Sequence, residues 1–307
     1  MPQQKTVILV AGPTAVGKTG LAIELALHYH TEIISADSRQ CYKELSIGVA
    51  RPSAKELHLV PHHFIGSHSI YDPVTAASFE EFAMEKAAAL FQHNNLVVMV
   101  GGTGLYLRAF TDGLDPIPAV PPSITEELLQ EYNRFGLPWL QQQVAAADPK
   151  FYSKAEVQNP HRLLRALAVF RATGASIEAF RQRAPKSRPF QIIPLLLQLP
   201  LPRLHQNIAQ RVDDMMLQGL EAEVRSLIPF QQLQPLHTVG YKELFQYFNG
   251  SSSLSQATEA IKLHTRQYAK RQLTWFRKVP RYIPFSPDDR PVIIQHIDKL
   301  LLTAAQH

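Results

Sequence analysis

The sequence predicts an α/β fold in which a parallel sheet is flanked by helices and a helical domain is inserted. Apolar runs and helical patterns alternate between residues 5 and 110, with strands expected at 7–10, 32–35 and 96–100 and helices at 19–29 and 76–92. This alternation is typical of parallel strands joined by helices that cover both faces of a sheet. Four prolines within residues 114–122 then predict a linker, and further helical patterns follow it.

The first strand is followed directly by GPTAVGKT, which fits the phosphate-loop pattern G-x-x-x-x-G-K-[ST]. Glycines let such a loop wrap a diphosphate, while backbone N–H groups and the following helix N-terminus supply positive charge. We therefore expect a P-loop NTPase-like core. Lys18 would reach the phosphate oxygens, and the Thr19 hydroxyl would hold Mg²⁺, the one cofactor expected. The diphosphate-binding residues would be Gly12, Pro13, Thr14, Ala15, Val16, Gly17, Lys18 and Thr19.

Two further segments follow strands, as the phosphate loop does. Asp37 comes after the second strand, and Gly101-Gly102-Thr103 comes after the third. Ligands of such sheets bind at the carboxyl ends of the strands, so the three segments should converge there. The third strand ends in glycine rather than in the aspartate that holds Mg²⁺ in many NTPases, and no N-K-x-D motif occurs. From the residues alone, Asp37 is a Mg²⁺ partner, a general base or the cap of a turn.

Beyond the linker, residues 123–135, 139–147 and 159–173 show helical patterns. Residues 191–199 then form one more apolar run typical of a buried strand, and helical patterns continue from about residue 204 to 279. The expected organisation is a catalytic core from residues 1–114 and 189–284, a helical insertion at 115–188 and a C-terminal tail at 285–307.

Composition limits the class of protein. The chain has 307 residues, of which 45% are hydrophobic and 19% charged. It lacks an apolar run of the roughly 18 residues that span a membrane. The single cysteine, Cys41, excludes an internal disulfide framework and suits a reducing compartment. We expect a cytoplasmic, monomeric protein with no signal peptide and no membrane partner.

Charge is unevenly distributed along the chain. The net charge is +5, and residues 266–281 (RQYAKRQLTWFRKVPR) contain six basic residues and no acid. A second basic cluster lies among prolines at Arg181, Arg183, Lys186 and Arg188. Each segment alone is typical of a solvated surface. Two such segments beside a diphosphate loop favour a nucleic-acid partner.

The motifs also match a known family in order and spacing. They are GPTAVGKT, IISADSRQCY with SIGVARP, HHF with ASF, VGGTGLYLRA, NPHRLLRAL, RVDDMMLQGL with VGYKEL, and RQYAKRQLTWFRK. From about Val7 to Lys278 the chain resembles the bacterial tRNA dimethylallyltransferases. The resemblance implies transfer of a dimethylallyl group from dimethylallyl diphosphate to N6 of the adenosine 3′ of the anticodon, with Mg²⁺. The partner would be the anticodon stem-loop of tRNA.

The resemblance also implies roles for individual residues. Asp37 would be the general base that takes the proton of the attacking amine, and Thr103 would lie beside the acceptor base. Arg108 and Arg211 would bind the diphosphate. The residues expected to contact tRNA are Asp37, Ser38, Arg39, Gln40, Thr103, His161, Arg162, Leu163, Leu164, Arg165, Arg266, Lys270, Arg271 and Arg277.

Two other functions share part of these features. An ATP-dependent small-molecule or nucleotide kinase would use the same loop with Lys18 and Thr19, but it has no use for the basic segment at residues 266–278. An RNA-binding module with a vestigial loop would not need Lys18. Val49, Gly66 and Ala168 depart from the pattern of the family, which concerns fine substrate recognition rather than the reaction.

Overall fold

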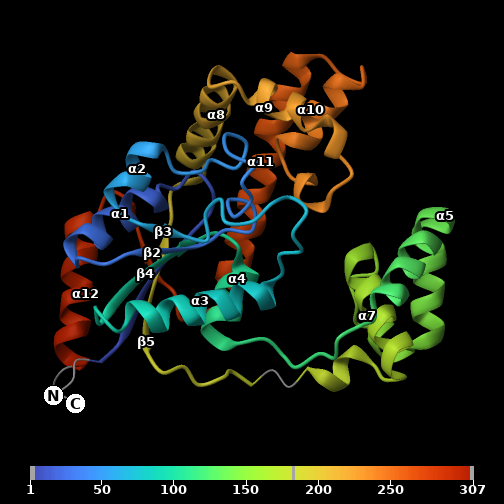
Figure 1. Ribbon diagram of the computed structural model, residues 1–307, viewed down its shortest axis with the longest axis horizontal. Coiled ribbons are helices and arrows are strands. Elements are labelled where there is room, and N and C mark those ends of the chain that lie inside the picture. The colour runs from blue at the N-terminus through green and yellow to red at the C-terminus, as the bar shows by residue number, and fades with distance from the viewer. Residues whose placement is uncertain (1–3, 182–183, 305–307) are drawn as a thin grey trace. The chain divides into compact units, whose positions relative to one another are not determined.

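The structure is a computed structural model that describes residues 4–181 and 184–304 (Figure 1). It consists of two compact units. One unit combines Met1–Asp112 with Ser187–His307, and the other is Gly113–Lys186. These boundaries lie within two residues of the insertion expected at 115–188. The first unit is an α/β sandwich and the second is helical.

A six-stranded parallel sheet forms the centre of the first unit, in the order β3-β2-β4-β1-β5-β6. The expected α/β class is therefore confirmed. The phosphate-loop strand β1 pairs with β4 on one side and β5 on the other. It is buried throughout, as expected of a strand covered on both faces. The strands are β1 (Thr6–Ala11), β2 (Ile33–Ala36), β3 (His62–His63), β4 (Leu96–Gly101), β5 (Gln191–Leu197) and β6 (Ile283–Phe285).

Alternate residues of β1 face two separate hydrophobic layers. Val7 and Leu9 belong to one layer and Ile8 and Val10 to the other, as the two-residue period of a strand requires. The first layer includes side chains of α3 (Ala76–Leu90) and α4 (Gly104–Asp112). The second includes side chains of α1 (Lys18–His28) and α12 (Arg290–Ala304). Helices thus cover both faces of the sheet.

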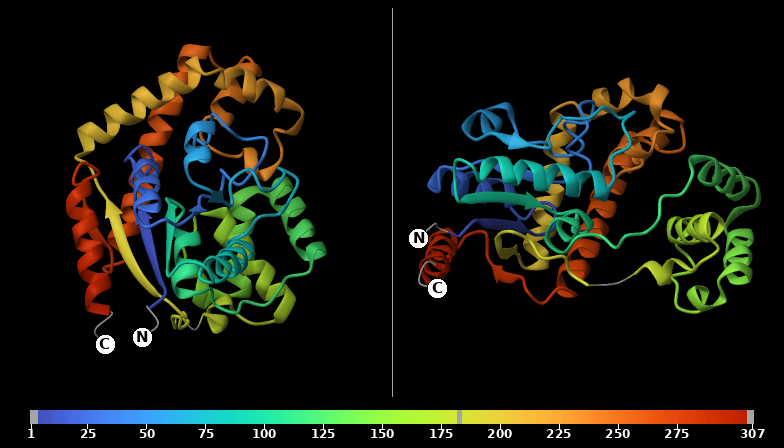
Figure 2. Two further views of the ribbon diagram at one scale, coloured as in Figure 1. Left: turned by 60° about the vertical axis from the view of Figure 1, so that its left-hand side comes forward. Right: turned by 60° about the horizontal axis from the view of Figure 1, so that its bottom comes forward.

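Residues 285–307 were expected to be a separate tail, but their described part, residues 285–304, belongs to the core unit. Phe285 ends β6, and α12 packs Ile293 and Ile297 into the second layer. Figure 2 shows α12 as the red helix beside the sheet. The hydroxyl of Tyr29 also donates a hydrogen bond to Asp298 at 2.8 Å. Strand β6 is only three residues long and contains Pro284, so no strand pattern is recognisable in its sequence.

The helical stretch expected from residue 204 to 279 is divided into four α-helices. They are α8 (Leu201–Leu217), α9 (Leu220–Ser226), α10 (Tyr241–Phe248) and α11 (Leu254–Arg277), with short 3₁₀ turns at Ile228–Phe230 and Gln234–Leu236. Gly219 and Gly240 have φ values of 98° and 96°, which glycine adopts at little cost, and they stand directly before α9 and α10. A further short helix, α2 (Ala54–Leu59), begins with a capping box of Ser53 and Glu56.

The second unit has a core of its own. Its helices are α5 (Pro122–Ala147), α6 (Pro149–Tyr152) and α7 (Pro160–Thr173), followed by a 3₁₀ turn at Ile177–Phe180. Leu128 and Leu140 of α5 pack with Leu163 of α7. Helix α5 is kinked at Gly136, whose φ is 76°, and this kink replaces the gap expected between two helices.

Candidate active site at the carboxyl edge of the sheet

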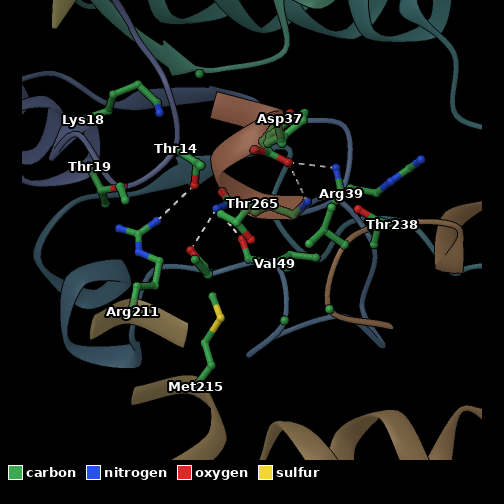
Figure 3. Close-up of a pocket in the computed structure, with 18 of the residues that line it drawn as sticks. Thr14, Lys18, Thr19, Asp37, Arg39, Val49, Arg211, Met215, Thr238 and Thr265 are labelled. Carbon is green, nitrogen blue, oxygen red and sulfur yellow. Dashed lines mark hydrogen bonds between the residues drawn. The ribbon is translucent and has the colours of Figure 1, made fainter. Parts of the chain in front are cut away.

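A cavity of about 320 Å³ opens at the carboxyl ends of β1, β2 and β4 (Figure 3). Its wall includes Lys18 and Thr19 of the phosphate loop, Asp37 after β2, and Gly101 at the end of β4. The convergence expected from the sequence is therefore confirmed. Helices α8 and α11 close the cavity, with Arg211 contributed by α8.

The phosphate loop has the strained backbone that its glycines predict. Gly12 has a φ of 154°, and a Cβ atom there would lie 2.8 Å from the carbonyl oxygen of Leu197. Gly17 (φ 96°) precedes α1 and offers no side-chain cap, so the first N–H groups of the helix are left for a ligand. Of the eight predicted loop residues, the cavity is lined by Thr14, Ala15, Gly17, Lys18 and Thr19, whereas Gly12, Pro13 and Val16 are buried behind it.

Two cations face the loop. The ammonium of Lys18 donates a hydrogen bond to the carbonyl oxygen of Pro13 at 2.7 Å. Burial, together with the positive charge of Arg211, lowers the pKa of Lys18 to about 7, and Asp37 acts in the opposite direction. Arg211 donates a hydrogen bond to the Thr14 hydroxyl at 3.4 Å, and burial lowers its pKa as well. Two half-buried, mutually repelling cations make this wall favourable for an anion.

Asp37 has one oxygen engaged and one free. Its Oδ1 accepts hydrogen bonds from the backbone N–H groups of Arg39 (2.9 Å) and Gln40 (3.2 Å). Its Oδ2 accepts none within the described residues, and the side chain lines the cavity. In Figure 3 Lys18 and Thr19 lie on the left and Asp37 lies to their right. The carboxylate therefore caps a turn, and its second oxygen is left for a ligand, so capping does not exclude either of the other two roles.

Thr103 lies next to the Asp37 turn. Its hydroxyl oxygen accepts the backbone N–H of Ser38 at 3.1 Å. The strands approach so closely here that a Cβ atom on Gly101 would lie 2.3 Å from the carbonyl oxygen of Ala36. Gly101 of the predicted Gly101-Gly102-Thr103 motif thus allows the contact that joins the ends of β2 and β4.

Sequence reasoning missed Gln272, which links two walls of the cavity. Its Oε1 accepts the backbone N–H of Thr14 at 2.8 Å, and its Nε2 donates to the carbonyl oxygen of Gly102 at 2.9 Å. The side chain is 7% exposed. A usable signal was present, because the residues of α11 that line the cavity recur at helical spacing: Ile261, Thr265, Tyr268 and Gln272.

A loop after β2 forms the apolar part of the wall, and sequence reasoning missed this too. The carboxylate of Glu223 accepts the backbone N–H groups of Ile47 (2.8 Å) and Gly48 (3.1 Å) and the hydroxyl of Tyr241 (2.6 Å). These bonds fix the loop against α9 and α10. The apolar residues that line the cavity beside this loop are Val49, Ala50, Val212, Met215, Val239 and Ile261.

Arg108, expected to bind the diphosphate with Arg211, does not line this cavity. Its neighbours Leu107 and Ala109 are buried against the core, which turns Arg108 to the exposed side of α4. There it lines a second cavity together with Trp275 and Lys278. The expected role at the diphosphate does not fit this placement.

The tRNA-contacting residues expected in the second unit divide into two groups. His161, Arg162 and Arg165 are exposed on α7, where they form one face. Leu163 has no exposed surface and lies in the core of that unit, and Leu164 is half-buried. The side chain of Leu163 therefore cannot contact RNA in this fold. It packs the helix that presents the neighbouring cations.

The basic segments also differ in exposure. On α11, Lys270, Arg271 and Arg277 are exposed and Arg266 is half-buried. Arg188 of the second basic cluster is instead buried in an ion pair with Glu80 at 2.7 Å. Of the same cluster, Arg181 pairs with Glu178, and Arg183 lies outside the described residues. The second cluster is therefore not a free basic surface, because at least two of its arginines have acidic partners.

Protein side chains alone do not form a metal site. Within residues 4–181 and 184–304, no group of three or more His, Cys, Asp or Glu side chains could hold an ion. The Thr19 hydroxyl and the Asp37 carboxylate both line the cavity, however, and both are oxygen ligands of the kind that Mg²⁺ prefers. A metal here would need the oxygens of a bound phosphate.

Fold and site together define a class of protein. It is a P-loop α/β protein with a cation-lined cavity that also contains a carboxylate, and it has a glycine where many NTPases have a metal-binding aspartate. The model of the IPP transferase family matches residues 40–279. A tRNA dimethylallyltransferase of Christiangramia forsetii is 45% identical over 92% of this chain and 93% of its own length. One from Bacteroides thetaiotaomicron is 40% identical over 95% of both. The chain belongs to the IPP transferase family.

Solved structures agree with this assignment. The tRNA isopentenylpyrophosphate transferase of Bacillus halodurans matches with a TM-score of 0.73 and 29% identity, over 99% of each chain. A eukaryotic dimethylallyltransferase acting on tRNA shares the fold, with a TM-score of 0.79 and 24% identity, over 95% of this chain and 79% of that one.

Among the described helices, none is long and apolar enough to cross a membrane.

Proposed function

We propose that this protein transfers a dimethylallyl group from dimethylallyl diphosphate to N6 of the adenosine 3′ of the anticodon in tRNA. The relatives described above are named for this activity. One observation supports it most directly: a single cavity has the cationic phosphate loop in one wall and the free carboxylate oxygen of Asp37 in another. The reaction needs both parts of this cavity. The cations bind the diphosphate leaving group, and the carboxylate removes a proton from the attacking amine.

On the donor side, negative charge grows on the diphosphate as the bond between C1 and oxygen breaks. The N–H groups at the start of α1, together with Lys18 and Arg211, face the place where that charge develops. Fixed donors of this kind stabilise a transition state because they need no reorganisation. A bound diphosphate would also raise the pKa of Lys18 again, since it supplies the missing counter-charge.

The residues present fit a magnesium ion that is shared with the substrate. The Thr19 hydroxyl would hold it, and diphosphate oxygens would complete its ligands. When bound, Mg²⁺ neutralises charge on the departing diphosphate. Binding and orientation of the diphosphate otherwise come from the loop and its two cations.

On the acceptor side, the exocyclic N6 forms the bond to C1 and must lose one proton. The Oδ2 atom of Asp37 would take it, while the two backbone bonds to Oδ1 hold the carboxylate in place. A positioned base of this kind contributes about 10²–10⁴ in rate. The apolar wall at Val49 and Met215 would hold the hydrocarbon chain and exclude water.

An adenine stacked in an anticodon loop cannot reach this cavity, so the base must be flipped out. Contacts to the RNA would come from exposed basic residues on two helices. These are His161, Arg162 and Arg165 on α7 and Lys270, Arg271 and Arg277 on α11. They would bind phosphates, which position the RNA without reading its sequence. We expect the protein to act as a monomer.

The test is transfer of label. The protein is incubated with Mg²⁺, radiolabelled dimethylallyl diphosphate and an unmodified tRNA that has adenosine 3′ of the anticodon. Label should enter this tRNA and not its guanosine variant. Parallel reactions with labelled ATP address the kinase alternative. ATP consumption without prenyl transfer would contradict the proposal.

A further inference from the structure

A second cavity, of about 310 Å³, lies at the other end of the turn that contains Thr103. Gly104, the next residue, lines this second cavity, whereas Gly101 lines the first. Helix α11 contributes to both, through Gln272 to the first and Trp275 to the second. Three residues of helix span only about 4.5 Å. The two cavities therefore lie close to each other along α11.

Two cations of the second cavity have no acidic partner among the described residues. Arg281 is neutralised by Asp112, to which it donates a hydrogen bond at 2.9 Å, and it also donates one to Thr111 at 2.7 Å. Arg108 and Lys278 form no ion pair within the described part of the chain, and both are exposed. A cavity with two uncompensated positive charges favours an anion.

Aromatic side chains give the same cavity flat apolar surfaces. Trp275 and Tyr282 are half-buried, pack against the first hydrophobic layer and line the cavity. Burial raises the pKa of Tyr282 to about 12, so its hydroxyl stays protonated and able to donate a hydrogen bond. A flat aromatic surface beside a cation is typical of sites that stack a nucleobase and hold its phosphate. The volume is within the range of small-ligand pockets.

We propose that this second cavity binds one nucleotide of the acceptor RNA, next to the adenosine whose base enters the first cavity. Arg108 and Lys278 bind its phosphate, and Trp275 supplies the stacking surface. The inference rests on the proposed function, because it takes RNA as the acceptor. It gives Arg108 a ligand different from the diphosphate, in agreement with its distance from the phosphate loop.

Kinetics of three variants test the charges. Arg108→Ala and Lys278→Ala should each raise KM for the RNA by about tenfold, the usual cost of a charge-assisted contact. KM for dimethylallyl diphosphate should change less than twofold. Lys299→Ala is the matched control, because it removes an exposed cation from α12, away from both cavities. An RNA KM equal to that of the control would overturn the proposal.

Fluorescence tests the stacking surface. The chain has two tryptophans, so Trp139→Phe leaves Trp275 as the only reporter. Binding of an anticodon stem-loop should quench it. A series of stem-loops, each abasic at one position, should contain one position that abolishes quenching and raises KM about tenfold. Added to Trp275→Ala, that abasic site should have no further effect. The proposal would be contradicted if every abasic site raised KM by the same factor in Trp275→Ala as in the protein with Trp275. It would also be contradicted if free AMP quenched the fluorescence as strongly as the stem-loop does.

Failure of the inference is distinguishable from failure of the proposed function. If the wild-type protein transfers no label to any tRNA, the proposed function fails. If it transfers label normally and Arg108→Ala behaves like Lys299→Ala, only the second site is wrong.

Discussion

Gln272 and Thr14 lie 258 residues apart in sequence and are joined by a 2.8 Å hydrogen bond between a side-chain oxygen and a backbone N–H group. The same side chain donates to Gly102, so one residue of α11 sets the distance between the phosphate loop and the turn that leads to Thr103. It also uses the Thr14 N–H, which is consequently not free for a diphosphate. Gln272 is best described as a positioning residue.

Replacement of Gln272 by methionine should therefore lower kcat/KM by about ten- to a hundredfold. The Thr14 N–H would lose its acceptor, and the buried carbonyl oxygen of Gly102 would lose its donor at a cost of about 1–3 kcal/mol. Gln272→Glu keeps an acceptor for the Thr14 N–H but places a second oxygen against the carbonyl oxygen of Gly102. The phosphate loop then keeps its bond while the turn that leads to Thr103 loses its own. Affinity for the diphosphate should therefore fall less than kcat. The control is Gln267→Met, an exposed position on the same helix. Equal kinetics for Gln272→Met and Gln267→Met would exclude the positioning role.

Asp37→Asn separates the two roles of this residue. Asparagine keeps an oxygen for the N–H groups of Arg39 and Gln40, but it cannot accept the proton of the amine. We expect kcat to fall by about 10²–10⁴, with the Kd for tRNA unchanged within a few-fold. Single-turnover transfer and filter binding measure the two quantities. A collapse of tRNA binding would instead make Asp37 a recognition residue.

The lowered pKa of Lys18 predicts a pH dependence of diphosphate binding. Because this pKa is about 7 in the ligand-free protein, the side chain is largely neutral at pH 8–9. Binding of a diphosphate would then take up a proton, and affinity should fall as pH rises above 7. Calorimetry in two buffers of different ionisation enthalpy measures that uptake. Lys18→Arg, which remains charged, should bind diphosphate without it.

The lowered pKa of Lys18 also determines whether the stability of the protein rises or falls with pH. The unfolded chain has an ordinary lysine, so it binds more protons than the folded protein between about pH 7 and 10. The free energy of unfolding of the ligand-free protein should gain a contribution from Lys18 as pH rises through this range. Lys18→Met should remove that contribution. Thermal unfolding of both proteins at several pH values checks it, and parallel pH profiles would show that Lys18 does not titrate here.

Local patterns were sufficient for much of this site. The run Val7–Val10, the GPTAVGKT loop and the helix after it are adjacent in sequence, so β1, the phosphate loop and α1 were predictable. Asp37 followed because parallel strands place their carboxyl ends together. The edge strand β3 has only two residues, too few for any hydrophobic period.

The remaining parts depend on contacts between distant segments. Glu223 meets the loop at Gly48 across 175 residues, and no spacing rule connects them. Leu163 was misassigned because it lies between exposed cations of one helix, and only the packing of α7 against α5 shows that it points inward. Arg108 was misassigned for a similar reason, since the side of α4 that packs on the core decides which cavity it lines.

Glu223 provides the last test, because it holds a loop of the cavity wall in place but does not itself line the cavity. Glu223→Gln keeps the size of the side chain but removes the charge and one of the two acceptor oxygens that Ile47, Gly48 and Tyr241 share. At least one donor then loses its acceptor, which should lower the free energy of unfolding by about 1–3 kcal/mol. The loop with Val49 should loosen, so KM for dimethylallyl diphosphate should rise about tenfold while the Kd for tRNA is unchanged.

Two controls separate the loop from general destabilisation. Tyr241→Phe removes only the hydroxyl bond and should have a smaller effect on KM. Glu221→Gln changes the same residue type two residues earlier on α9, where its partner is the exposed Arg225. It should leave KM within twofold, because surface ion pairs contribute little. If Glu223→Gln and Glu221→Gln lower thermal stability equally and neither changes KM, the loop is held by packing rather than by this carboxylate.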